Sequence, residues 1–417
     1  MNNFFRMFGI IAFVTVIGFT MAACSSGGDG DDNPGDKTSG SISSAYSWYG
    51  NGSANSFTIS NAAQLAGFAR IVSGKTGEGG PAQSDFKGKT VTLSADINLT
   101  DQWVSIGDGS PANPFAGTFD GNGKTIFGLY YFNTYGFSSG LFDRVGEGGI
   151  VKNIVLTDID ITFGYSGGGV VDYNYGTVQN CYVTGSIAGG SSVGGVVGTN
   201  YGTVQNCSFS GNVNGGSRIG GVVGQNIGDD SVLGQVRNCY ATGTVNGGAS
   251  SVGGVVGSNG ISGMVQNCYS TNSVNSSLNA VGGVVGYNQS MVQNCYATGS
   301  ITGNWYIGGV VGNNNGTIRN SVALNTSIIA STINNYVLGR ISENYSSNVD
   351  FTNNYGLTEM VMRSGYTIAP DANGPDGADV STDEAATQNW WINAVNWDFN
   401  TVWQWDSIRN LPELRMQ

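Results

Sequence analysis

Runs of β-branched residues bounded by Gly and Asn turns fill the middle of the chain, with no helical spacing of apolar positions. These runs recur: the segment VGGVVG at residue 193 returns as VGGVVG or IGGVVG at residues 219, 252, 281 and 307. Weaker copies begin at residues 138, 167 and 337, so that successive copies start 26 to 33 residues apart. A period of this length predicts a solenoid in which each unit forms one coil of a parallel β-helix.

The second half of each unit, typified by TVQNCYVTG, carries one Asn at the same position. Asn tolerates the left-handed conformation of a sharp bend, and stacked amides can bond one another along a solenoid axis. We interpret the column as an internal ladder at a turn. The alternative is a polar strip that recognises a ligand. The ladder is favoured because the stacked amides can satisfy one another's hydrogen bonds without a ligand. The column consists of Asn153, Asn180, Asn206, Asn238, Asn267, Asn294 and Asn320.

Five Cys residues follow five of these Asn residues: Cys181, Cys207, Cys239, Cys268 and Cys295. Ile154 takes the same site at one end of the series, which indicates an inward, apolar position. Neighbouring coils lie ~4.8 Å apart, within reach of a disulfide, but stacked side chains point in parallel. We therefore expect free buried thiols, because a metal-thiolate site would need ligands that converge from several directions.

The pattern GG-V-V-G-x-N followed by V-x-N-C-Y-x-T-G resembles the GLUG repeat of bacterial surface proteins, most clearly over residues 167–320. The segments AAQLAGFARIVSG and FAGTFDGNGKTI upstream, and NWDFNTVWQWDSIRNLPELR downstream, are similar to segments that flank such repeats. The resemblance implies a right-handed β-solenoid at the cell surface, with adhesin-like or unassigned roles. A glycine-rich repeat of this kind specifies architecture well and activity poorly.

The expected fold class is all-β, a right-handed parallel β-helix of about nine to ten coils over residues 85–356. Open sheet edges at both ends require caps. Residues 45–84 provide the N-terminal cap with a short helix, for which Ser60 is the expected N-cap. Residues 357–417, which contain five Trp between residues 390 and 405, provide the C-terminal cap, or alternatively a sugar-binding platform.

Residues 1–23 hold one cation and an apolar stretch that is too short for a secure membrane span, so they are interpreted as a signal peptide. The ending MAAC resembles a bacterial lipobox, which implies lipid attachment to Cys24. Ser25 implies, by resemblance to lipoprotein sorting, the outer membrane. Residues 24–44 are rich in Ser, Gly and Asp and form a lipid-anchored flexible tether. An ordinary secretory signal with an incidental Cys is the alternative.

The amino-acid composition excludes several kinds of catalytic site, metal site and partner. The chain has no His, which excludes Ser-His-Asp catalysis and His-based zinc sites. Its 16 Lys and Arg against 28 Asp and Glu give a net charge of −12, which argues against nucleic acid and anionic lipid headgroups. Gly residues number 68 without a Gly-X-Y period, and 40% of residues are hydrophobic, so the chain can build a core.

Alignment of AGTFD, SGLFD and GGVVD places Asp120, Asp143 and Asp172 in one column, where later coils have Gly. Three interpretations stay open: solvated turn residues paired with Lys124 or Arg144, weak calcium ligands, or the carboxylate pair of a glycosidase. A second acidic loop, residues 370–379, resembles a calcium loop only loosely, and we expect it to be a flexible insertion.

The expected function is non-enzymatic display and binding at the cell surface, through adhesion to a glycan or an extracellular matrix component of a host or community. Trp305 and Tyr306 form the candidate binding patch, and the variable loops at residues 227–233 and 259–263 offer further recognition surface. A surface polysaccharide-degrading enzyme that uses the Asp column is the alternative, and an envelope spacer is a third. The pattern calls for no cofactor.

Overall fold

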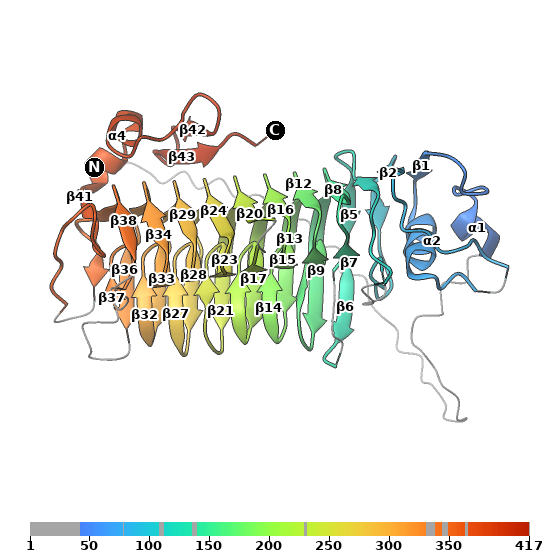
Figure 1. Ribbon diagram of the computed structural model, residues 1–417, viewed down its shortest axis with the longest axis horizontal. Coiled ribbons are helices and arrows are strands. Elements are labelled where there is room, and N and C mark those ends of the chain that lie inside the picture. The colour runs from blue at the N-terminus through green and yellow to red at the C-terminus, as the bar shows by residue number, and fades with distance from the viewer. Residues whose placement is uncertain are drawn as a thin grey trace, which may run out of the picture. The chain divides into compact units, whose positions relative to one another are not determined.

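The computed structural model describes residues 42–77, 79–107, 112–135, 140–228, 232–330, 338–343, 349–362 and 366–416. The expected signal peptide, Cys24 and most of the tether lie outside the described residues. The described chain belongs to one compact unit, Thr38–Gln417. This unit is a parallel β-solenoid of about eight turns with few helices, and Figure 1 shows its strands stacked along the long axis.

Four parallel sheets, named A to D here, run the length of the solenoid, and each turn visits them in the order D, C, A, B. Sheet A contains β1 (Ser56–Ile59), β2 (Thr90–Leu93), β4 (Thr118–Asp120), β8 (Ile150–Lys152), β12 (Thr177–Gln179), β16 (Thr203–Gln205), β20 (Gly234–Arg237), β24 (Gly263–Gln266), β29 (Met291–Gln293), β34 (Thr317–Arg319) and β38 (Asp350–Thr352). Sheet C contains β7 (Phe142–Val145), β11 (Val171–Asn174), β15 (Val197–Asn200), β19 (Val223–Asn226), β23 (Val256–Asn259), β28 (Val285–Asn288) and β33 (Val311–Asn314). Sheet D contains β10 (Gly167–Gly168), β14 (Ser191–Gly194), β18 (Ser217–Gly220), β22 (Val252–Gly253), β27 (Asn279–Gly282), β32 (Trp305–Gly308) and β37 (Leu338–Gly339).

Sheet B is the widest and divides into two halves after a bend. Its main path contains β3 (Ile97–Asn98), β5 (Thr125–Phe127), β9 (Val155–Phe163), β13 (Tyr182–Ala188), β17 (Ser208–Gly215), β21 (Tyr240–Gly247), β25 (Tyr269–Ser270), β30 (Tyr296–Ala297), β35 (Val322–Ala323), β39 (Tyr355–Leu357) and β41 (Ala378–Val380). Beside this path lie β6 (Tyr130–Asn133), β26 (Ser273–Ser276), β31 (Ile301–Gly303), β36 (Ser327–Ala330) and β40 (Val361–Met362). In the described residues sheets C and D have seven strands each, so complete turns are slightly fewer than the nine to ten expected. Within the described parts of the chain, the coils at both ends contribute strands to sheets A and B but have no strand in sheet C, in sheet D, or in either of them.

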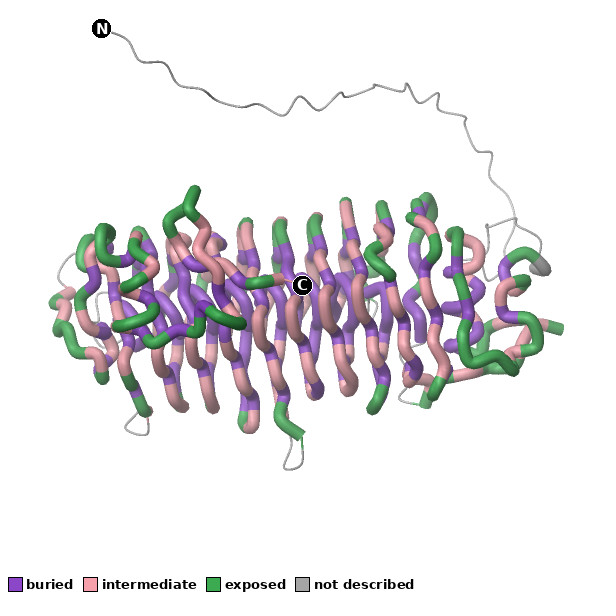
Figure 2. Tube along the Cα trace, turned by 90° about the horizontal axis from the view of Figure 1, so that it is seen from above, coloured by how far each residue is buried: buried purple, intermediate pink, exposed green. Residues whose placement is uncertain are grey.

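Stacked β-branched side chains fill the interior. In sheet A, Val178 pairs with Val204 and Val204 with Val236, and none of the three has exposed area. Figure 2 shows this buried interior continuing along the solenoid. Gly is required where sheets C and D approach one another: a Cβ on Gly224 would lie 2.4 Å from the Ser192 carbonyl carbon.

Two Asn ladders tie successive coils together. The first, at the corner between sheets A and B, is the column singled out in the sequence; its residues have φ between 48° and 56°. Each amide Nδ2 donates to the Oδ1 of the coil before it at 3.0–3.3 Å, from Asn180 onto Asn153 through to Asn353 onto Asn320. Asn153 in turn donates to Asp120 Oδ1 at 3.0 Å.

The second ladder closes the corner between sheets C and A and is completely buried. Its amides donate in the opposite direction, each to the following coil, at 2.7–2.8 Å. This column was not predicted from the sequence, although an Asn ends every VVGxN segment and could have indicated it. The ladder consists of Asn174, Asn200, Asn226, Asn259, Asn288 and Asn314.

The Cys column lies inside the solenoid. All five thiols are free and have no exposed area. Each Sγ lies 3.1–3.3 Å from the carbonyl oxygen two residues earlier, as in Cys207 onto Gln205. Ser321 continues the column and makes the same contact with Arg319 through its hydroxyl at 2.9 Å.

Helices α1 (Ile42–Tyr46) and α2 (Ala62–Ser73) occupy the N-terminal end. The expectation that Ser60 caps the helix is wrong: Asn61 is the N-cap, and its Oδ1 accepts from Gln64 N at 3.0 Å. Ser60 instead donates through its backbone N–H and hydroxyl to Gln64 Oε1. Phe68 of α2 is buried against Phe86, Phe115 and Phe119, so aromatic rings replace the Val and Cys core at this end.

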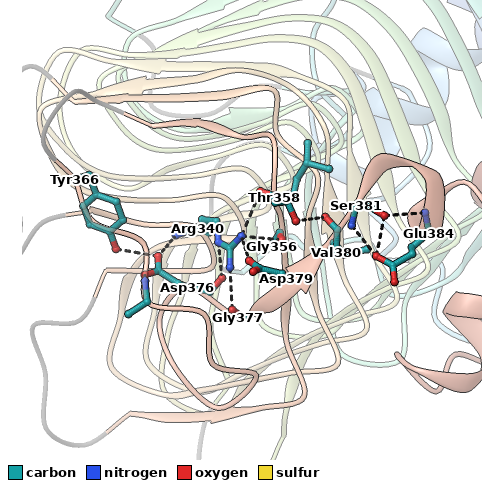
Figure 3. A network of polar contacts seen from close by, with 12 residues as sticks. Arg340, Gly356, Thr358, Tyr366, Asp376, Gly377, Asp379, Val380, Ser381 and Glu384 are labelled. Atoms are coloured by element: carbon teal, nitrogen blue, oxygen red, sulfur yellow. Dashed lines mark hydrogen bonds and ion pairs between the residues drawn. The ribbon is translucent and has the colours of Figure 1, made fainter.

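The acidic loop at residues 370–379 covers the C-terminal end and is not a flexible insertion. Its backbone joins the last coil, where Ile341 N donates to Pro375 O at 2.8 Å. Arg340, which has no exposed area, donates to the carbonyl oxygens of Gly356, Asp376 and Gly377 at 3.0 Å each and pairs with Asp379 at 2.8 Å (Figure 3). A buried guanidinium with this many acceptors fastens the loop to the coil.

The Trp-rich tail forms the short helices α3 (Thr382–Ala385) and α4 (Gln388–Asn393) and the hairpin of β42 (Trp403–Asp406) and β43 (Leu411–Leu414). It folds back along the side of the solenoid (Figure 1). Trp391, Trp397 and Trp403 are buried against Tyr269 and Tyr296 of sheet B. The tail therefore covers the first half of the sheet B strands from β21 to β39, while the acidic loop covers the end.

Candidate binding face

The second half of sheet B presents an outer surface of hydroxyl and amide side chains that the C-terminal tail does not cover. We call this surface the polar face of sheet B. Its side chains are half-buried or exposed, and none carries a charge. It consists of Ser186 on β13, Asn212 and Asn214 on β17, Thr244 and Asn246 on β21, Ser273 and Asn275 on β26, and Thr302 on β31.

Strand register aligns these side chains in two columns parallel to the solenoid axis. Ser186, Asn212, Thr244 and Ser273 follow one another in the first column. In the second column, Asn246 Nδ2 donates to Asn214 Oδ1 at 2.9 Å, and Asn275 Nδ2 donates to Asn246 Oδ1 at 3.1 Å. Because these contacts restrict the rotamers before any ligand arrives, binding to the face loses little side-chain entropy.

Exposed apolar side chains lie at both ends of the same columns. Toward the N-terminal end, Tyr130 and Phe132 of β6 are aligned with Asp160 and Thr162 of β9. They are 43% and 54% exposed. Toward the C-terminal end, Ile329 of β36 is aligned with Thr302 and is 40% exposed. The polar face is thus bounded by surfaces able to contact apolar faces of a ligand.

Trp305 and Tyr306 begin β32 at the corner where the chain leaves sheet B for sheet D. Trp305 is 41% exposed and aligned with Asn279, while Leu278 beside it is 45% exposed. Tyr306 is half-buried and has φ 55°. Trp305 therefore belongs to the same coil as Thr302 and borders the polar face.

The other two variable loops lie at a different corner. Residues 227–233 and 259–263 both connect sheet C to sheet A, and Gly228 N donates to Ile261 O at 3.2 Å. Since the sheets follow the order D, C, A, B, this corner is opposite the corner that holds Trp305. These loops and Trp305 cannot contact one small ligand together.

The prediction that three Asp residues share one column is wrong for Asp120. Asp143 and Asp172 occupy equivalent positions on β7 and β11 of sheet C. Asp120 ends β4 of sheet A, where it is aligned with Lys152 and forms an ion pair with that residue at 3.2 Å, and not with Lys124. The spacing in the sequence already indicates that Asp120 and Asp143 are not equivalent, because they lie 23 residues apart, which is shorter than any interval between repeats.

The two stacked carboxyl groups are buried, which contradicts the solvated-turn interpretation. Asp172 has no exposed area and Asp143 is 1% exposed. Asp172 Oδ2 accepts from Ser166 Oγ at 3.2 Å, and among the described residues its Oδ1 has no hydrogen-bond partner. The Arg144 guanidinium lies over the Tyr173 ring at 4.6 Å. In the next coil a Cβ on Gly198 would lie 2.7 Å from Asp172 Oδ1, so Gly is needed beside this carboxyl group.

Burial, together with the neighbouring Asp143 carboxylate, raises the pKa of Asp172 well above its usual value, against the opposing effects of Ser166 and Arg144. The folded protein therefore holds a proton that the unfolded chain loses above about pH 4, and stability falls as pH rises from there. Replacing Asp172 by Asn keeps the shape and removes this cost. We expect a higher free energy of unfolding than that of the parent protein at neutral pH, with a difference that shrinks as the pH falls toward 4.

Urea unfolding measured between about pH 4 and pH 7 tests this, with Asp120→Asn as the control. Partial burial opposes ionisation of Asp120, but the hydrogen bonds from Asn153 and Asn122 and the Lys152 ammonium lower its pKa on balance. The ionised Asp120 carboxylate stabilises the fold above its unfolded pKa, and this stabilisation is lost as the pH falls. Asp120→Asn should therefore lower the free energy of unfolding at neutral pH, and only slightly, because the ion pair is half-exposed. A stability profile for Asp172→Asn that parallels the parent protein would contradict the assignment.

Neither a metal cluster nor a membrane-spanning helix is found in the part of the chain that the structure describes. No group of three or more His, Cys, Asp or Glu side chains there is arranged to hold a metal ion. No helix there has both the length and the apolar character needed to cross a bilayer. The calcium hypothesis for Asp120, Asp143 and Asp172 loses its basis, because the three carboxyl groups do not converge.

The fold is that of a parallel β-solenoid, and comparison with known families identifies its repeat. Residues 189–214, 215–246, 248–275 and 277–302 match the model described as the GLUG motif. The central coils are therefore built from GLUG repeats, as the residue pattern predicted. Each matched segment spans about one turn through sheets D, C, A and B.

Two curated proteins are similar to part of the chain. Halomucin of Haloquadratum walsbyi is 32% identical over 105 residues, which is 23% of this chain and 1% of that protein. A protein of Evansella cellulosilytica named as a Gly-rich membrane protein is 38% identical over 101 residues, which is 22% of this chain and 12% of that protein. The chain thus spans only a small part of either relative.

Among solved structures, the chain is similar to a candidate immunoglobulin A1 protease from Bacteroides ovatus. The likeness covers 87% of this chain and 92% of that one, with 20% sequence identity and a TM-score of 0.47.

Proposed function

We propose that this protein is a cell-surface lipoprotein of the outer membrane whose solenoid is a non-enzymatic binding module, adhering to a glycan or an extracellular matrix component. The observation that carries the proposal is the polar face of sheet B: uncharged, aligned, uncovered and mounted on a rigid scaffold. Recognition on a regular β-scaffold needs such a surface.

The surface location draws on the sequence and on the relatives. Residues 1–23 have the pattern of a signal peptide and Cys24 that of a lipid-attachment site. The two similar proteins are named as a halomucin and a membrane protein. Lipidation at Cys24 would keep the solenoid at the membrane, because several acyl chains on one cysteine anchor a protein stably.

Protease shaving of intact cells tests the location, with an antibody against the Trp-rich tail as the reporter. Digestion in intact cells supports surface display. Protection until the outer membrane is permeabilised would contradict display and favour an envelope spacer.

Binding is tested by incubating the purified protein with a panel of polysaccharides and matrix proteins and measuring retention. Retention with intact ligand supports the binding module. New reducing or unsaturated ends would contradict the non-enzymatic function and favour a polysaccharide-degrading enzyme. The burial of Asp143 and Asp172 gives that alternative no support, because a substrate cannot reach either carboxyl group.

Trp305→Ala is expected to weaken binding of the retained ligand by about tenfold, as truncation of an exposed aromatic anchor does. Ile261→Ala is the matched control, since Ile261 is also exposed and apolar, at 69%, but lies at the opposite corner. Titration of both variants by isothermal calorimetry checks this. Equal losses in the two variants, or none in Trp305→Ala, would contradict the placement of the site beside sheet B.

A further inference from the structure

We infer that the polar face of sheet B binds a neutral, extended glycan chain that lies parallel to the solenoid axis. The inference rests on the proposed function and deepens it, because it names the class of ligand, the face and the direction of the ligand.

Charge selects a neutral ligand. From β17 to β31 every outward side chain on the polar face ends in a hydroxyl or an amide. These groups both donate and accept hydrogen bonds, as sugar hydroxyls do. The outer face of sheet A differs, because cations occur in its central column: Lys152, Arg237 and Arg319 are aligned with Gln179, Gln205 and Gln293. An anionic polymer would find its complement on sheet A and not on sheet B.

The spacing of equivalent side chains along the solenoid favours an extended ligand that lies parallel to the axis. Equivalent side chains of successive coils repeat every ~4.8 Å. An extended chain of β-linked sugars advances by roughly the same distance per residue, so successive sugars can each meet hydroxyl or amide side chains. A hydroxyl and an amide occur together on β21 and β26, and two amides occur on β17. Across the axis no such repeat exists, because each strand offers only two outward polar side chains between the bend and the corner, such as Thr244 and Asn246.

The boundaries set the length of the site. The C-terminal tail covers the first half of sheet B from β21 to β39 and leaves the second half as a strip along the axis. The first halves of β13 and β17 stay exposed at Thr184 and Ser210. The exposed carboxylate Asp160 of β9 is aligned with Ser186 and ends the uncharged strip on one side, with the exposed rings of Tyr130 and Phe132 one strand further out. Trp305 lies at the other end, where its ring can stack on a sugar face. The uncharged strip from β13 to β31 crosses five strands, or about 19 Å, which matches about five sugars at one sugar per coil.

The test uses the purified full chain and neutral linear gluco-, xylo- and manno-oligosaccharides from disaccharide to octasaccharide, titrated by calorimetry. Affinity is expected to increase with chain length and to level off near the pentasaccharide. It should be the same at low and high salt, because an uncharged ligand is not screened. A plateau at the trisaccharide would overturn the axial direction, and a strong salt dependence would overturn the neutral class.

The variant Thr244→Ala with Asn246→Ala is expected to weaken binding of the hexasaccharide by about tenfold or more, since two hydrogen-bonding side chains are lost at the centre of the face. Gln205→Ala is the control: Gln205 belongs to a similar outward ladder on sheet A, where it donates to Gln179 Oε1 at 2.7 Å. The control should retain the parent affinity, and circular dichroism should show both variants folded.

The outcomes separate this inference from the proposed function. If the parent protein binds a glycan and the double variant binds it equally well, the polar face is overturned while the binding module stands. If the parent protein binds a matrix protein and no oligosaccharide, the glycan class is overturned. If it binds nothing in either panel, both the inference and the proposed function fail.

Discussion

Replacing Asn226 by Leu is expected to lower the free energy of unfolding by about 3 kcal/mol. Asn226 is completely buried in the second Asn ladder. Its Nδ2 donates to Gly234 O at 3.0 Å and to Asn259 Oδ1 at 2.8 Å, and its Oδ1 accepts from Asn200 at 2.8 Å. Leu has a similar volume but takes the Asn226 donor away from Asn259 Oδ1 and Gly234 O, both away from water, which is more costly than the loss of the bonds themselves. Asn200 Nδ2 keeps Gly202 O as an acceptor at 3.0 Å.

Urea unfolding followed by circular dichroism measures this effect, and Asn246→Leu is the matched control. Asn246 stands in a ladder of the same chemistry, with bonds to Asn214 and Asn275, but on the polar face of sheet B, where water can replace a lost partner. The control should change stability by less than about 0.5 kcal/mol. Equal losses at the two positions would show that burial does not determine the contribution of these ladders.

Arg340→Met is expected to cost about 3–5 kcal/mol, because it takes a buried guanidinium donor away from three backbone carbonyl oxygens. The guanidinium joins the last coil to the acidic loop through carbonyl oxygens of Gly356, Asp376 and Gly377 and through Asp379 (Figure 3). The backbone carbonyl oxygen of Asp376, a residue that is 2% exposed, would lose its guanidinium donor. The Asp376 carboxylate would keep its bonds from Tyr366 Oη and Ala369 N, both at 2.8 Å. The loop should then detach from the coil.

Thermal unfolding and limited proteolysis within residues 366–380 measure the two consequences. Arg409→Met is the control, because Arg409 pairs with Asp406 and Glu413 while 42% exposed and should contribute less than about 1 kcal/mol. Arg340→Lys should be intermediate, since an ammonium retains the charge but cannot reproduce the planar fork of donors. An Arg340→Met protein with parent stability and an intact loop would refute the structural role of this network.

The candidate site illustrates how far sequence reasoning reaches. Trp305 was singled out from the sequence as an exposed aromatic residue, and it is 41% exposed at a corner of the solenoid. The polar face beside it was missed, because Ser, Thr and Asn in a Gly-rich repeat have the same composition as turns. Only the strand register shows that Thr244, Asn246 and Asn275 form part of one aligned surface.

The Asp residues show the opposite failure. The segments TFD and LFD have the same local pattern of apolar residues before an acid, so alignment placed Asp120 with Asp143. Strand pairing assigns the first to sheet A and the second to sheet C. Burial then separates them further, since Asp120 is half-exposed and paired with Lys152, whereas Asp143 and Asp172 face no solvent.

The sequence by itself determined the repeating coil. An interval of 26 to 33 residues, the recurring VVG and the Asn at a fixed position specify a parallel solenoid, because each unit can bury its apolar face only against the next. The tertiary structure alone decided which segments that are distant along the chain meet: the tail against sheet B, the acidic loop over the last coil, and the loops at opposite corners. These contacts depend on the direction of the chain after each coil and on packing between different elements, and the local periodic pattern encodes neither.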